Sequence, residues 1–155
     1  MNALVAYFSA TGTTAGVAKK IAYALDADIF PIMPVEPYTP ADLDWMDSQS
    51  RSSREMKDEA SRVEIKKRVA NMKQYDTLFV GFPIWWYVAP HIINSFLEQY
   101  DLSGKTIHLF ATSGGSGMGH TVAELQSSAP GAKFGKAERF PANVSDKVIE
   151  KWVKA

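Results

Sequence analysis

Apolar and polar residues alternate in blocks along most of the chain, so that short apolar runs are separated by amphipathic segments. Continuous apolar runs predict buried strands at residues 4–8, 77–82 and 106–111. Shorter strands are predicted at residues 28–33, where Pro31 marks a sheet edge, and near residues 135–140. Periodicity and capping residues predict helices at residues 13–25, 52–58, 63–72, 90–100 and 121–128 and in a last segment capped by Ser145 or Asp146.

Strands that alternate with helices imply a parallel sheet covered by helices on both faces. We therefore predict an α/β fold of three layers in one domain, residues 1–155, which is long enough for a single good core. Residues 34–62 interrupt the pattern, because they are polar, contain three prolines and are long for a connection. We expect them to form a solvated surface segment anchored by Tyr38 and Trp45.

The composition excludes several classes of function. Lys plus Arg and Asp plus Glu both number 17, so the chain lacks the basic surplus of nucleic-acid-binding proteins. Without cysteine it has no thiolate nucleophile and no cysteine-ligated metal or iron–sulfur cluster. No apolar run approaches a membrane span, and the N-terminus has no signal-peptide pattern. We expect a cytoplasmic protein that binds neither nucleic acid nor membranes and has no metal site.

The first candidate site lies between the strand at residues 4–8 and the helix that begins at residue 13. Its small and hydroxyl residues are Ser9, Thr11, Gly12, Thr13 and Thr14. Backbone N–H groups, hydroxyls and the positive end of a helix dipole meet there and suit a phosphate. A Walker lysine is missing and only two glycines of a dinucleotide fingerprint are present, so donors without a cation would hold one terminal phosphate. The alternative is an ordinary helix cap.

Two further loops also join the end of a strand to the start of a helix. The second loop carries planar side chains: Pro83, Ile84, Trp85, Trp86 and Tyr87. The third loop is made of small residues and includes Thr112, Ser113, Gly114, Gly115 and Gly117. Separately, the tryptophan pair is explained by a core and the glycines by a plain turn, although two adjacent residues on extended backbone cannot both face one core.

The topology joins the three loops into one candidate site. In a parallel sheet all of them emerge at the carboxyl edge, where ligands bind at the point of reversal of strand order. The loops then offer phosphate donors, surfaces for stacking and backbone that can approach a ring closely. Together they predict a ligand with a phosphate at one end and a flat heterocycle at the other, for which flavin mononucleotide (FMN) is the candidate.

Three stretches of the chain, YFSATGTT, VGFPIWWYVAP and LSGKTIHLFATSGGSGMG, resemble the flavodoxin family, in particular its short branch with a Trp-Trp second loop. The resemblance runs from the first strand to about residue 120. It implies a five-stranded parallel sheet in the order 2-1-3-4-5 and FMN bound without a covalent bond. It also implies that the first loop holds the phosphate and that the second and third loops contact the ring. The flavin supplies the chemistry, so no catalytic side chain is expected.

The chain departs from the family in charge and in the third loop. Electron-carrying flavodoxins are strongly acidic and often cover the flavin with an aromatic residue of the third loop, whereas this chain is neutral and has none there. Two functions stay open. One is an electron carrier that docks to redox partner proteins. The other is an NAD(P)H or quinone reductase that acts on a small-molecule electron acceptor at a less covered flavin, with a less negative second reduction potential.

Charged and histidine residues outside the three loops give weaker hypotheses. The alternative to a solvated segment at residues 34–62 is that its charged side chains close over the site, with a methionine near the ring: Arg51, Arg54, Glu55 and Met56. The histidines, His91, His108 and His120, have no spacing that indicates a metal site or a catalytic triad. Of these only the last adjoins a predicted ligand loop.

Overall fold

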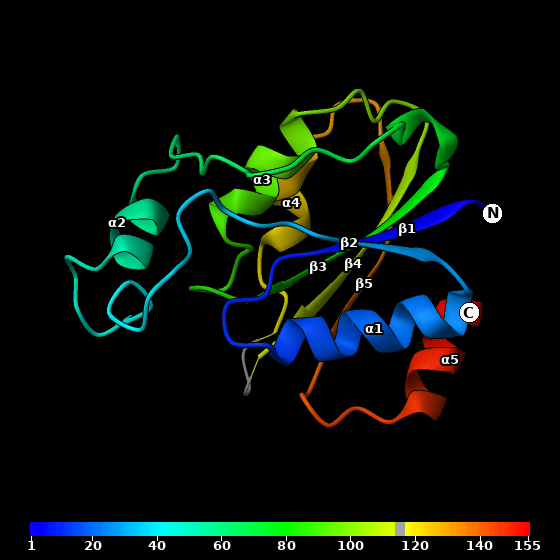
Figure 1. The fold of residues 1–155 in the computed structure, drawn as a ribbon, viewed down its shortest axis with the longest axis horizontal. Helices are drawn as coiled ribbons and strands as arrows, with labels where there is room; N and C mark the ends of the chain where they lie inside the picture. The colour runs from blue at the N-terminus through cyan, green and yellow to red at the C-terminus, as the bar shows by residue number, and fades with distance from the viewer. Residues whose placement is uncertain (114–116) are drawn as a thin grey trace.

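The computed structural model describes residues 1–113 and 117–155, which form an α/β fold of three layers (Figure 1). Five strands make one parallel sheet in the order β2-β1-β3-β4-β5. The strands are β1 (Ala3–Tyr7), β2 (Asp28–Pro31), β3 (Thr77–Pro83), β4 (Thr106–Thr112) and β5 (Lys133–Phe140). The predicted fold class and strand order are therefore confirmed, and Pro31 lies in an edge strand as expected.

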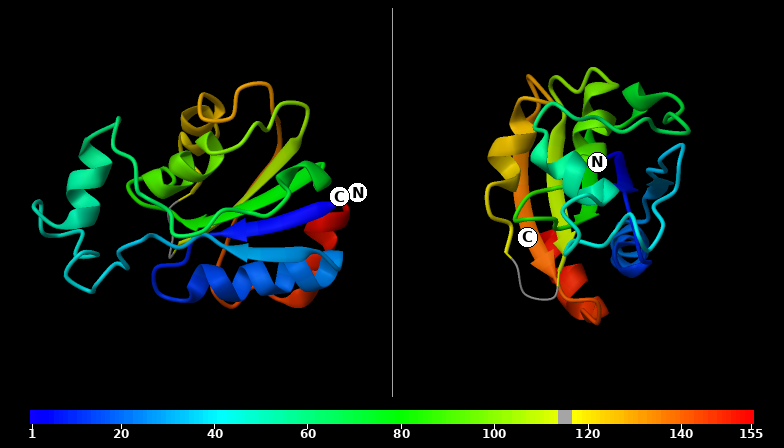
Figure 2. Two further views of the ribbon diagram at one scale, coloured as in Figure 1. Left: turned by 45° about the horizontal axis from the view of Figure 1, so that its top comes forward. Right: turned by 90° about the vertical axis from the view of Figure 1, so that its left-hand side faces the viewer.

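Helices cover both faces of the sheet. They are α1 (Thr13–Leu25), α2 (Arg51–Lys57), α3 (His91–Glu98), α4 (Thr121–Gln126) and α5 (Asp146–Lys154), with a 3₁₀ turn, η1 (Met72–Gln74). Figures 1 and 2 show α1 and α5 on one face and α3 and α4 on the other, while α2 stands apart from the sheet. Most predicted element boundaries differ from these by one or two residues, and that of α1 agrees.

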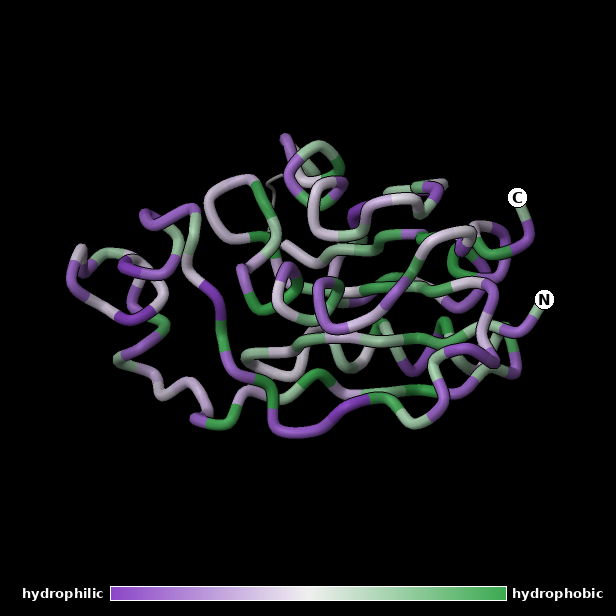
Figure 3. Tube along the Cα trace, turned by 90° about the horizontal axis from the view of Figure 1, so that it is seen from above, coloured by the Kyte–Doolittle hydropathy of each residue, from purple (hydrophilic) through white to green (hydrophobic). Residues whose placement is uncertain are grey.

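Each face of the sheet has its own apolar core. Val5 and Phe110 pack with Ile21 of α1 on one face, and all three side chains are fully buried. Leu4 and Leu109 point to the opposite face, where they pack with residues of α3 and α4. Figure 3 shows the hydrophobic residues gathered on the strands. Because neighbouring residues of a strand face opposite sides, a sheet covered twice needs the continuous apolar runs that the sequence contains.

The helix predicted around residues 63–72 is wrong. The backbone there is irregular or extended until η1, and Ile65 forms an isolated antiparallel bridge with Pro34. The amide of Val35 donates to the carbonyl of Glu64 (3.0 Å), and the amide of Lys66 donates to that of Met33 (2.8 Å). Val63 and Ile65 are buried while their neighbours are exposed, which is the two-residue period of a strand. This bridge closes residues 34–65 into a loop with its own stem.

Candidate functional site

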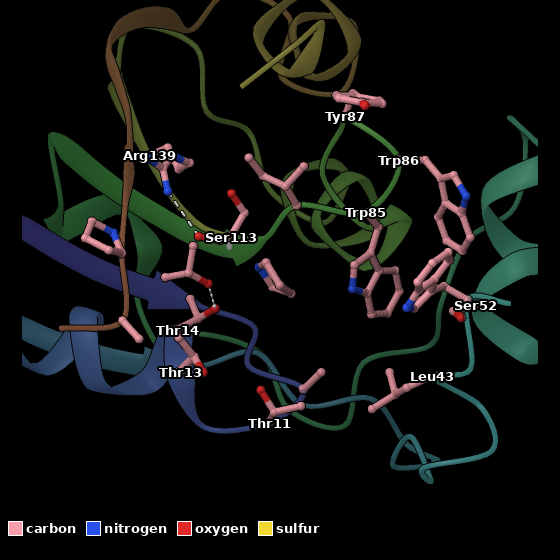
Figure 4. Close-up of a pocket in the computed structure, with 17 residues that line it drawn as sticks. Thr11, Thr13, Thr14, Leu43, Ser52, Trp85, Trp86, Tyr87, Ser113 and Arg139 are labelled. Atoms are coloured by element: carbon pink, nitrogen blue, oxygen red, sulfur yellow. Dashed lines mark hydrogen bonds between the residues drawn. The ribbon is translucent and has the colours of Figure 1, made fainter. Parts of the chain in front are cut away.

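A pocket of about 910 Å³ opens at the carboxyl edge of the sheet (Figure 4). It receives residues of all three predicted loops, which are Thr11, Thr13, Thr14, Pro83, Ile84, Trp85, Trp86, Tyr87, Thr112 and Ser113. Ser9, Gly12 and Gly117 belong to the same loops but do not line the pocket, and Gly114 and Gly115 lie outside the described residues. The volume falls within the range of small-molecule and cofactor sites.

Ser9 builds the first loop from within. Its Oγ accepts hydrogen bonds from the amides of Gly12 (3.0 Å) and Ala15 (3.2 Å), which are two of the donors that the start of α1 leaves without helical partners. Gly12 itself has φ of 95°, a left-handed conformation that favours glycine. The next two amides, of Thr13 and Thr14, have no acceptor among the described residues. They are the donors that remain for an anion at this helix end.

Thr14 joins the first loop to the third. Its hydroxyl shares a 2.8 Å hydrogen bond with the hydroxyl of Thr112 at the end of β4, and both side chains are buried. The carbonyl of Thr112 in turn accepts from the amide of Ile84 (3.1 Å) in the second loop. The three loops are thus held in one arrangement by hydrogen bonds between them. The hydroxyls of Thr11 and Thr13 are exposed in the pocket, whereas that of Thr14 already has a protein partner.

The second loop is a tight turn, so its expected extended backbone is wrong. The amide and carbonyl of Trp85 bond the carbonyl and amide of Val88 (2.9 and 3.2 Å). The two residues between them, Trp86 and Tyr87, have φ of 49° and 67°. Positive φ at both central positions is the pattern of two-residue hairpin turns and costs bulky residues about 1–2 kcal/mol each. The turn directs Trp85 onto Phe8 (ring centroids 5.8 Å apart) and leaves Trp86 and Tyr87 exposed.

Glycine in the third loop makes room for this turn. Gly119 has φ of 55°, and a Cβ atom there would overlap the carbonyl oxygen of Tyr87. Two positive-φ aromatic residues beside a pocket are a conformation that proteins retain mainly where it serves binding. The positive φ angles of Trp86 and Tyr87, which the close packing of Gly119 accommodates, therefore support a functional role for the second loop.

Arg139 is a site residue that the sequence reasoning missed. It lies near the end of β5 beside Ala111 of β4, and it is the only Lys, Arg, Asp or Glu among the described residues that line the pocket. Its Nη1 donates to the carbonyl of Ser113 (3.1 Å), and within the described chain no carboxylate comes within ion-pair distance. A signal existed in the sequence, because a charged residue at the carboxyl end of the last strand reaches the same edge as the three loops.

Residues 34–62 form a fourth wall of the pocket, to which they contribute Leu43, Trp45 and Ser52. Tyr38 anchors this segment as predicted, since its ring lies 5.6 Å from that of Phe8 and 5.4 Å from that of Trp85. Trp45 is no anchor, because 70% of its surface is exposed. The segment is therefore more than a solvated surface loop.

Arg51 and Glu55 of this segment bind each other rather than close over the pocket. Arg51 lies 3.9 Å above the ring of Tyr38 and pairs with Glu55 (3.0 Å), and the Tyr38 hydroxyl donates to the same carboxylate (2.5 Å). Burial and the bond to Glu55 raise the pKa of Tyr38, so its hydroxyl stays a donor. Arg51, Arg54, Glu55 and Met56 do not line the pocket.

Two of the three histidines, His91 and His108, make hydrogen bonds within the fold. Nδ1 of His91 lies 2.6 Å from the hydroxyl of Ser61, and Nδ1 of His108 accepts from the amide of Lys136 (2.9 Å). Burial lowers the pKa of both rings. His120 is exposed and does not line the pocket. In the described part of the chain no cluster of three or more His, Asp or Glu residues is arranged to hold a metal ion, and no helix has the length and apolarity to cross a membrane.

Comparisons with known proteins place the chain in a family. The chain is similar to crystal structures of candidate flavoproteins from Bacteroides eggerthii (46% identity, TM-score 0.93, 99% of this chain and 96% of that chain) and Bacteroides uniformis (47%, 0.94, 99% and 98%). A flavoprotein from Lactobacillus acidophilus, solved in complex with FMN, has the same fold (21%, 0.76, 98% of both chains). No curated protein matches the sequence. The family model described as flavodoxin matches residues 2–155, and the chain belongs to the flavodoxin family.

Proposed function

We propose that this protein binds FMN without a covalent bond and transfers electrons through it. One observation carries the proposal: the pocket has threonine hydroxyls, and amides with no acceptor among the described residues, at one end and planar aromatic side chains at the other. FMN has a phosphate and a flat ring system at the matching ends. The flavoprotein of Lactobacillus acidophilus, which shares the fold, is in complex with FMN.

The residues present fit this cofactor. The amides of Thr13 and Thr14 and the hydroxyls of Thr11 and Thr13 would hold the phosphate at the start of α1. The second loop would frame the ring, and Arg139 adds one positive charge for an anionic ligand. FMN supplies the redox chemistry when bound. The protein binds and orients it and sets its potential through backbone contacts, stacking and exclusion of water.

The test is direct. The purified protein is expected to show a flavin spectrum, or to take up added FMN in equimolar amount after the bound cofactor is removed. The bound flavin is then reduced with dithionite and mixed with ferricyanide, and reoxidation is followed by absorbance. Protein that neither contains nor takes up FMN would show that the proposal is wrong.

A second candidate, an FMN-dependent reductase of small molecules, is favoured over a carrier by the fourth wall. A carrier needs only an exposed flavin edge for a partner protein, whereas this pocket continues past the three loops to Leu43, Trp45 and Ser52. Steady-state oxidation of NADH or NADPH with a quinone distinguishes the two functions. A reductase turns over both substrates, and a carrier does so only when a separate reductase protein is added.

A further inference from the structure

The mouth of the pocket has aromatic walls on two sides. Trp45 and Leu43 come from residues 34–62, and Trp86 and Tyr87 come from the second loop. Figure 4 shows that Leu43 and Trp86 lie on the side of the pocket away from Arg139. We propose that this outer part of the pocket binds a flat, uncharged electron acceptor of the quinone class, with Trp45 as a residue that contacts it. The proposal rests on FMN occupying the inner part.

The exposure of these side chains is the first argument. Trp45, Trp86 and Tyr87 line the pocket although 70%, 45% and 63% of their surfaces are exposed. Burial of apolar surface is favourable by roughly 25 cal/mol per Å², so three open aromatic side chains forgo considerable stabilisation. Clustered exposed aromatic residues mark a binding surface. Two of them also adopt left-handed backbone conformations, which a loop with no ligand to bind has no need to retain.

The fixed position of the fourth wall is the second argument. Tyr38 packs on Trp85 at the base of the second loop, and the guanidinium of Arg51 lies over the ring of Tyr38, 3.9 Å from its centroid. Nη1 of Arg51 also donates to the carbonyl of Glu36 (2.7 Å). The stem between Pro34 and Ile65 closes the segment. Trp45 is thus carried by a braced loop, and a site whose walls exist before binding loses less entropy when the ligand enters.

The distribution of charge selects the class of ligand. Of the described residues that line the pocket only Arg139 is charged, and it lies at the other end. An anionic acceptor would find no cation at the mouth among the described residues, whereas an apolar ring would stack on tryptophan. In the reaction the quinone gains two electrons from reduced FMN and two protons from reduced FMN and water. It becomes the corresponding hydroquinone, and FMN is left oxidised.

The experiment uses FMN-loaded protein, reduced with dithionite without excess and mixed with 1,4-naphthoquinone in a stopped-flow instrument. The reoxidation rate of the wild-type protein is expected to saturate with quinone concentration. Trp45→Ala should raise the half-saturating concentration roughly tenfold or more, because a stacking surface is lost. Trp45→Phe should restore much of the loss. The FMN dissociation constant of Trp45→Ala should stay within about twofold of wild type, since stacking on a separate ligand is the only interaction removed.

Met46→Ala is the matched control. Met46 follows Trp45 in the sequence and is 79% exposed, but it does not line the pocket. The half-saturating quinone concentration of Met46→Ala should therefore equal that of the wild-type protein. A rate that never saturates, or an unchanged constant in Trp45→Ala, would overturn the inference. So would a weakened FMN affinity with unchanged quinone saturation, because Trp45 would then cover the flavin itself. Ferricyanide oxidation of the wild-type holoprotein separates these outcomes from failure of FMN binding and electron transfer.

Discussion

Ser9 and Thr13 both belong to the predicted phosphate loop, but Ser9 holds the loop together whereas Thr13 lines the pocket. The hydroxyl of Ser9 accepts from two amides at the start of α1, at 3.0 and 3.2 Å. In Ser9→Ala both amides lose that acceptor, which for a capping residue costs about 1 kcal/mol. For a chain of this length we expect the melting temperature of the FMN-free protein to fall by about 2–4 °C. Binding of FMN should weaken as a consequence of the loosened loop.

Thr13→Ala is the contrasting variant. The Thr13 side chain is exposed and has no hydrogen bond within the described chain, so the FMN-free protein should keep its stability to within about 0.5 kcal/mol. If its hydroxyl donates to a phosphate, the variant loses a bond to a charged group of about 1.5–3 kcal/mol. The dissociation constant of FMN should then rise about 10- to 150-fold. Riboflavin, which has no phosphate, should bind both proteins equally.

The assay combines thermal unfolding of the FMN-free proteins, followed by circular dichroism, with titrations of FMN and riboflavin followed by flavin fluorescence. Two results would refute the reasoning. Ser9→Ala that keeps the wild-type melting temperature but binds FMN poorly would mean that Ser9 contacts the phosphate directly. If Thr13→Ala weakens the binding of riboflavin as much as the binding of FMN, Thr13 does not face the phosphate.

Three further predictions concern single residues. Arg139→Gln should weaken FMN binding more at low than at high salt, and Arg139→Lys should weaken it less; titrations at two salt concentrations measure this. Burial, and secondarily Lys136, lowers the pKa of His108, so its protonated form disfavours the native state. Urea unfolding should therefore show stability that is full above pH 6.5 and falls as the solution is acidified, with a smaller fall in His108→Gln. Gly119→Ala should destabilise the protein by at least about 1 kcal/mol in the same assay, through positive φ and overlap with Tyr87.

The sequence predicts those elements whose hydrophobic residues follow a single pattern along the whole element and whose surroundings are uniform. The run at residues 77–82 reads as a strand buried on both faces, and β3 is that strand. Residues 63–72 defeat the same reasoning, because few apolar residues are present and their pairing partners lie about 30 residues earlier, at Pro34 and Val35. The local sequence offers only the short alternation of Val63 and Ile65 with charged neighbours, and it does not show which distant segment forms the bridge.

The candidate site divides in the same way. The topology of a parallel sheet brings the three loops together, and the same rule applied to β5 would have found Arg139. The position of Trp45 has no such rule, since a lone tryptophan in a polar segment gives no sign of which surface it faces. The turn at Trp86 also lacked a signal, because its two central positions carry aromatic residues where such turns favour asparagine and glycine.

The two halves of the pocket are therefore held in place by different contacts. The inner half is held by hydrogen bonds between loops that continue directly from strands, such as that from the amide of Ile84 to the carbonyl of Thr112 (3.1 Å). The outer half depends on the closed loop of residues 34–65, whose Tyr38 packs on Phe8 and Trp85 and whose Val63 and Ile65 are buried in the core. Substitutions at Leu43 or Trp45 leave these anchoring contacts untouched. A fold that fixes the cofactor end and leaves the mouth to a separate segment can change its electron acceptor without rebuilding its flavin site.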